Sequence, residues 1–196
     1  MPQETMTPRE RWLAVLRREK PDRVPMDYWA TEETNRKLMK HLGLSTMDEV
    51  FERLHIDRPV FVDPFYVGPA LPKGTDVFGI REKVIAYDGG SYTEADGAPL
   101  AQYDSVEEIK ANYTWPSVDW YDFSVIPGQI EGREHRPIAG GGSEPFLFYK
   151  LLRGEEQAFM DLVLNPEIVH YCLDKLFDFD YQTTRRIYET IPGKVL

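Results

Sequence analysis

The stretch RPIAGGGSEPFLFYKLLRG, residues 136–154, sets the fold class, because it joins a short apolar strand to a helix through a glycine-rich turn. Residues 137–139 predict the strand, and residues 140–143 (GGGS) predict a flexible turn. A helix is expected over residues 145–153, since proline stands at its first position and glycine directly after its last. A strand that leads through a turn into a helix is the unit from which parallel α/β sheets are built.

The same alternation of strands and helices extends in both directions along the chain. Residues 59–62 (PVFV) predict a second apolar strand, and residues 23–29 predict another one before it. The last three residues, 194–196, resemble the start of one more strand. Capping residues, helical spacing of apolar residues and Pro or Gly stops predict six further helices, over residues 7–20, 31–41, 46–54, 105–113, 155–164 and 167–191.

The middle of the chain has a different pattern. Residues 80–87 alternate in part between apolar and polar side chains, residues 88–90 (DGG) are a turn signal, and residues 91–95 resume the strand pattern. A short Asp-Gly turn between two such runs is typical of a β-hairpin. We therefore expect a hairpin inserted into the α/β alternation.

These elements predict an α/β protein that is the N-terminal part of a (β/α)8 barrel with a β-hairpin insertion. Only three or four strands of barrel type can be counted, whereas a closed barrel needs eight and typically ~250 residues. We expect residues 1–196 to form one barrel-type domain that is truncated at its C-terminal end.

Composition excludes several classes of function. The chain has a formal net charge of −10 and no long run of Lys or Arg, so binding to nucleic acid is not expected. Cys172 is the only cysteine, which rules out an internal disulfide. No apolar run reaches the ~20 residues that span a bilayer, and the polar N-terminus does not resemble a signal peptide. We expect a cytoplasmic protein with no membrane partner.

Three candidate site residues follow from the strand ends, because catalytic residues of barrels lie at the carboxyl ends of strands. Asp63 comes directly after the strand at 59–62, and Asp27 and Trp29 end the strand at 23–29. The alternative for Asp63 is a carboxylate that caps a turn or helix, and the alternative for Trp29 is packing.

Two further patterns suggest ligands but fail on spacing. The glycines before Glu144 lack both phosphate-loop spacings, and its carboxylate repels phosphate, so we place Glu144 in a turn at the barrel mouth as a substrate contact. His170 and Cys172 have the spacing His-x-Cys, but in mid-helix such positions point ~200° apart. We therefore expect no metal site and a cysteine in the core.

The order and spacing of several motifs resemble the uroporphyrinogen decarboxylase superfamily. The matching segments are TPRER at 7–11, PDRVP at 21–25, FVD at 61–63, YTWP at 113–116, and the run from Gly140 to Glu167. The resemblance implies a (β/α)8 barrel that is often dimeric and acts on a small-molecule substrate. A homo-oligomer is thus expected.

For a decarboxylase, the resemblance implies a lyase of porphyrin biosynthesis that needs no cofactor. Such an enzyme protonates a pyrrole carbon, releases an acetate carboxylate as carbon dioxide and returns a proton. Asp63 matches the aspartate that accepts hydrogen bonds from the ring N–H groups and stabilises the cationic intermediate. The family's active-site tyrosine falls at Lys150, so Tyr149, one residue away, is the candidate for that role.

One departure from the family leaves the substrate open. Family decarboxylases hold their substrate's carboxylates with an Arg-x-x-x-Arg pair after the first strand. The matching positions here are Ala30 and Thr34, or Asp27 and Thr31, depending on the alignment. We therefore expect either a tetrapyrrole or another carboxylated substrate.

Two alternatives remain open at this point. The first is a corrinoid-dependent methyltransferase of the same superfamily, which would bind zinc in its C-terminal half and take methyl groups from a corrinoid protein. The second is a non-catalytic fragment or binding module.

Overall fold

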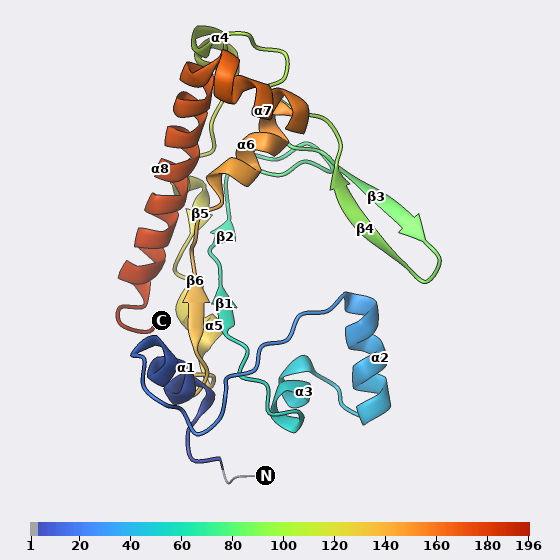
Figure 1. Ribbon diagram of the computed structural model, residues 1–196, viewed down its shortest axis with the longest axis vertical. Coiled ribbons are helices and arrows are strands. Elements are labelled where there is room, and N and C mark those ends of the chain that lie inside the picture. Colours follow the sequence, from blue (N-terminus) through green and yellow to red (C-terminus); the bar gives the residue numbers. More distant parts are fainter. Residues whose placement is uncertain (1–3) are drawn as a thin grey trace. The chain divides into compact units, whose positions relative to one another are not determined.

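The computed structural model describes residues 4–196 and divides them into two compact units (Figure 1). Unit 1 contains the chain up to Pro64, together with Phe123–Gly140 and Ile187–Leu196. Unit 2 contains Phe65–Asp122 and Gly141–Arg186.

Unit 1 contains one helix that was not predicted, over residues 126–130, and its first helix ends at Leu16 although residues 7–20 were expected to be helical. The three predicted helices of unit 1 each start within one residue of the expected position. They are α1 (Pro8–Leu16), α2 (Glu32–Leu42) and α3 (Met47–Arg53), and α2 ends at Gly43 with a left-handed φ of 68°. Helices α1 and α3 each start with a capping box, in which a threonine hydroxyl and a glutamate three residues later satisfy each other's backbone N–H. The pairs are Thr7 with Glu10 and Thr46 with Glu49.

The sheet of unit 1 is parallel, as expected. Strand β1 (Val60–Val62) pairs with β6 (Ile138–Gly140) in the register Val60↔Ile138 to Val62↔Gly140. On the other edge of β6, Val195 forms a parallel bridge with Ile138. The carboxyl ends of these segments therefore lie at one edge of the sheet.

One face of this sheet is buried and the other is open. Val60 and Val62 are buried in a cluster with isoleucines of α5 (Ile126–Ile130), β6 and the end of α8 (Pro166–Thr190). Phe61, which points to the opposite face, is 57% exposed. Because side chains alternate along a strand, Asp63 lies on the same side as Phe61.

The predicted strand over residues 23–29 is wrong. In the structure this segment has no regular secondary structure and makes one backbone bond to the segment before β1, from Asp57 N to Met26 O at 2.7 Å. Pro25 has no N–H to donate, and Met26 N donates to the Asp57 side chain at 2.8 Å. The backbone N–H groups that a β-ladder would need at positions 25 and 26 are therefore absent or already bonded.

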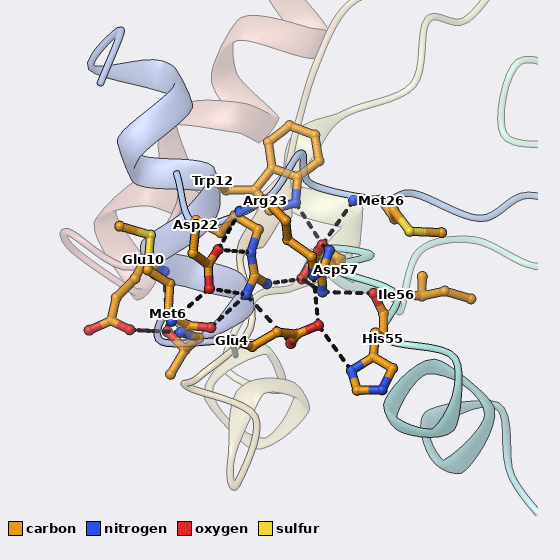
Figure 2. Close-up of polar contacts among 12 residues, drawn as sticks. Glu4, Met6, Glu10, Trp12, Asp22, Arg23, Met26, His55, Ile56 and Asp57 are labelled. Carbon is orange, nitrogen blue, oxygen red and sulfur yellow. Dashed lines mark hydrogen bonds and ion pairs between the residues drawn. The ribbon is translucent and has the colours of Figure 1, made fainter. Parts of the chain in front are cut away.

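The segment is held instead by a buried cluster of ions that sequence reasoning missed (Figure 2). Arg11 of α1 is fully buried; its Nη1 donates to Asp57 Oδ1 and its Nε donates to Asp22 Oδ1 at 2.7 Å. Arg23 Nη1 donates to the other Asp57 oxygen at 2.6 Å. Two arginines thus neutralise two carboxylates before β1 begins.

Unit 2 contains two antiparallel strand pairs and the remaining helices. The predicted hairpin is confirmed: β3 (Glu82–Tyr87) pairs with β4 (Gly90–Ala95), and Gly89 in the turn has a φ of 92°. The pairing of β2 (Phe65–Tyr66) with β5 (Tyr121–Asp122) was not predicted. The helices are α4 (Val106–Asn112), α6 (Pro145–Arg153), α7 (Glu155–Leu164) and the part of α8 up to Arg186, with a 3-10 turn at Val118–Trp120.

The core of unit 2 surrounds a buried carboxylate. Asp161 of α7 is fully buried, and Arg153 Nε donates to its Oδ2 at 2.8 Å. Burial raises the pKa of Asp161, but hydrogen bonds from four side chains outweigh this effect and lower that pKa to about 2. The other three donors are Asn165, Tyr149 and Gln157.

This geometry predicts a pH dependence of stability. The pKa of Asp161 is lower in the folded than in the unfolded chain, so its contribution is complete above about pH 4 and is lost as the pH falls towards 2. We expect Asp161→Asn to lower the free energy of unfolding at pH 7 by on the order of 2 kcal/mol, and the difference to shrink on acidification. Urea unfolding between pH 2 and 7 measures this, with Asp88→Asn in the exposed hairpin turn as control. A constant difference between wild type and Asp161→Asn would contradict the assignment.

The structure shows a mixed α/β protein, whereas a closed barrel is not formed by residues 4–196. Their strands make one parallel pair, extended by the bridge at Val195, and two antiparallel pairs. Within the same residues, no helix has the length and apolarity needed to cross a membrane.

Candidate active site at the carboxyl end of β1

Asp63 lies at the carboxyl edge of the parallel sheet of unit 1. It directly follows β1, whose last residue, Val62, is fully buried and paired with Gly140. A side chain added at Gly140 would meet Val62 Cγ2 at 2.7 Å and Val62 O at 3.0 Å, so glycine is required for this close approach. The position of Asp63 is thus set by a packed strand.

The backbone of Asp63 is held by one side chain of α5. Gln129 accepts a hydrogen bond from Asp63 N at 3.1 Å and donates one to Asp63 O at 2.7 Å. Its neighbours Ile126 and Ile130 are buried in the core, which fixes the helix that carries it. Sequence reasoning missed Gln129, because nothing local links positions 66 residues apart.

The carboxylate of Asp63 remains available. It is exposed, and within residues 4–196 it has no hydrogen-bond or ion-pair partner. An aspartate that capped a turn or helix would accept a bond from a nearby N–H. The geometry therefore does not show Asp63 as a carboxylate that caps a turn or helix.

Phe61 adds an aromatic surface on the same side of β1. Its ring lies 5.5 Å from the guanidinium carbon of Arg58. The alternation of residues 60–63 could have identified Phe61 as a neighbour of Asp63. The two residues are two positions apart in an extended segment, so their side chains lie on the same face.

The other two candidates of unit 1 are Asp27, which lies beside Arg58 before the start of β1, and Trp29. Arg58 donates to Tyr28 O, and its Nη1 lies 3.7 Å from Asp27 Oδ1. Asp27 also accepts a bond from Tyr28 N at 2.7 Å. Trp29 is 87% exposed. Within residues 4–196 no hydrogen bond or ion pair joins Asp27 to Asp63, and the roles of Asp27 and Trp29 as substrate contacts stay predictions.

The glycine-rich turn of unit 2, predicted to be flexible, is anchored to α8. Gly142 N donates to Thr184 Oγ1 at 3.1 Å, and Ser143 Oγ donates to Asp180 Oδ2 at 2.7 Å. Glu144 then stands at the start of α6 with an exposed side chain that does not cap the helix. It remains a candidate substrate contact.

Tyr149, in contrast, points into the core of unit 2. It is fully buried, and its hydroxyl donates to Asp161 Oδ2 at 2.7 Å. Burial raises the pKa of this hydroxyl, and the neighbouring carboxylate raises it further. The described arrangement gives Tyr149 a structural contact, and a contact with substrate stays a prediction.

The arrangement of His170 and Cys172 agrees with the helical geometry expected. His170 is exposed, whereas Cys172 is fully buried, and burial raises the pKa of its thiol to about 12. In the part of the chain that the structure describes, no group of three or more His, Cys, Asp or Glu side chains is placed to hold a metal ion.

Comparisons with protein-family models, with curated proteins and with solved structures gave no significant match.

Proposed function

We propose that this chain carries part of the active site of a uroporphyrinogen decarboxylase-like lyase. The observation that supports this most is Asp63, whose backbone is held by Gln129 while its carboxylate is exposed and has no partner among residues 4–196. An exposed carboxylate on a rigid strand end is suited to stabilise positive charge that develops during a reaction.

The proposal includes a (β/α)8 barrel of which β1, β6 and the segment at Val195 are neighbouring strands. The parallel order of these three segments supports it, as does the burial of only one sheet face. In such a barrel the face with Phe61 and Asp63 is turned inward, and the carboxyl ends carry the reacting groups.

The proposed reaction is loss of a carboxylate as carbon dioxide from an electron-rich ring. Protonation of a ring carbon creates a cation, and the side-chain carboxylate leaves as carbon dioxide with its bonding electrons returning to the ring. A proton then adds to the carbon that carried the carboxylate, and the ring carbon releases the proton that it gained first. Asp63 would accept hydrogen bonds from ring N–H groups and stabilise the cation. The proposed substrate is a tetrapyrrole or another carboxylated molecule, since Ala30 and Thr34 or Asp27 and Thr31 replace the paired arginines of the family.

An assay of two reactions tests the proposal. The protein that carries this chain is incubated without oxygen with uroporphyrinogen III, coproporphyrinogen III or simple pyrrole acetates, and released carbon dioxide is measured. A parallel reaction contains methylcobalamin and a thiol. Carbon dioxide release would support the lyase. Methyl transfer without carbon dioxide release would instead assign the methyltransferase. If neither reaction is detected, both the lyase and the methyltransferase are refuted.

A further inference from the structure

Unit 1 contains a pocket of about 190 Å³ at the amino ends of its parallel strands. Ile56 and Asp57, which precede β1, line it, and so does Arg136, which precedes β6. Asp63 lies at the opposite ends of the same strands. The pocket is thus separate from the candidate active site.

Arg136 is buried yet lacks a carboxylate partner. Only 3% of it is exposed. Its Nη1 donates to Ile56 O at a long 3.4 Å, and its guanidinium carbon lies 5.5 Å from the centre of the Phe51 ring. Across residues 4–196, no carboxylate oxygen lies within ion-pair distance of it.

The other buried arginines each have the carboxylate partner that Arg136 lacks among residues 4–196. Arg11 pairs with Asp22 and Asp57, and Arg153 pairs with Asp161. A buried charge without a counterion is costly, so such groups are normally paired. A guanidinium has five N–H donors, and one long bond leaves most of those of Arg136 unused.

Arg136 lines the pocket, and its unused donors are not sealed from solvent. In the described chain, the buried side-chain polar atoms without a partner are Trp115 Nε1 and Thr183 Oγ1, neither of which belongs to Arg136. The unbonded nitrogens of Arg136 therefore retain contact with solvent, and the pocket that Arg136 lines provides that contact.

Three carboxylates in the wall decide how strongly an anion is attracted. Asp57 is neutralised by Arg11 and Arg23, and Glu4 accepts from Arg23 Nε at 2.8 Å. The exposed carboxylate of Glu52 has no partner within residues 4–196. Arg11 and Arg23 are shared among Asp22, Asp57 and Glu4, so Glu52 is the carboxylate of the wall that has no cation beside it within residues 4–196.

We propose that this pocket binds a small oxyanion, with Arg136 as the ligating cation. Both phosphate and a short carboxylate present two oxygens at the spacing of a guanidinium fork. A volume of about 190 Å³ leaves room for either anion and several waters. The bound anion supplies the counterion that the chain itself does not provide.

Calorimetric titration with inorganic phosphate and, separately, with acetate tests the proposal, at pH 7.5 and constant ionic strength in chloride. We expect saturable binding of at least one anion at one site per chain. The stronger of the two identifies a phosphate or a carboxylate as the preferred class. Arg136→Met should weaken binding at least about tenfold, because it removes the charge-assisted contact and keeps much of the side-chain volume.

Two variants make the test specific. Glu52→Gln removes the competing charge and should tighten binding by about threefold; it also serves if Arg136→Met does not fold. Arg133→Met is the matched control, because Arg133 is half exposed and paired with Asp48 at 2.7 Å, and binding should be unchanged. The proposal is refuted if neither anion binds with a Kd below about 10 mM, or if Arg136→Met and Glu52→Gln both bind as the wild type does.

Discussion

Replacing Asp63 by Asn is expected to lower kcat by ~10²–10³ in the protein that carries this chain, while KM changes little. The substitution keeps the shape of the side chain and removes its charge. A carboxylate that meets positive charge only during the reaction lowers the barrier more than it tightens substrate binding. Steady-state kinetics with the substrate found in the carbon dioxide assay measures the effect.

The same variant should fold as well as the wild type. The Asp63 carboxylate makes no bond within residues 4–196, and the contacts of Gln129 are to its backbone. We expect a change in stability below about 0.5 kcal/mol, as for surface substitutions. Asp88→Asn in the hairpin turn is the control and should change neither quantity. Normal turnover of Asp63→Asn would remove Asp63 from the catalytic residues.

Replacing Arg11 by Met is expected to lower the free energy of unfolding of unit 1 by about 3–5 kcal/mol. Arg11 and Asp57 are both fully buried, so the variant leaves a buried carboxylate with one arginine fewer. Removing one partner of a buried pair is costly because the remaining charge stays out of water. Urea unfolding followed by tryptophan fluorescence reports this directly, since Trp12 Nε1 donates to Asp57 O at 2.8 Å.

A surface pair provides the control for Arg11. Arg36 is exposed, and its nitrogens lie 3.7–3.8 Å from Glu32 and Glu33 on the same helix. Arg36→Met should therefore cost no more than about 0.5 kcal/mol. Equal effects of Arg11→Met and Arg36→Met would show that the buried cluster does not stabilise unit 1.

Local patterns were sufficient to predict most helices and the hairpin, although not α5. The threonine caps at Thr7 and Thr46, the stop at Gly43 and the Asp-Gly turn before Gly90 act over two to four residues. Their hydrogen bonds form within the same segment, so neighbouring residues contain the information.

The same local reasoning failed where a distant residue takes the hydrogen bonds. The strand over residues 23–29 was predicted from its apolar pattern, but the Asp57 side chain takes the N–H of Met26. The glycine-rich turn was predicted to be flexible, but Thr184 and Asp180 of α8 hold it. In both places the deciding partner lies more than 30 residues away.

By itself, the sequence determined the α/β class, the bounds of most elements and the candidacy of Asp63 at a strand end. Only the tertiary structure decided which strands pair and that Gln129 holds the backbone of Asp63. It also decided that Arg11 and Arg153 have carboxylate partners, while Arg136 has none among the described residues 4–196. The physical reason is that periodicity and caps act between neighbours along the chain. The neutralisation of a buried charge depends instead on which distant side chains folding brings within a few ångströms.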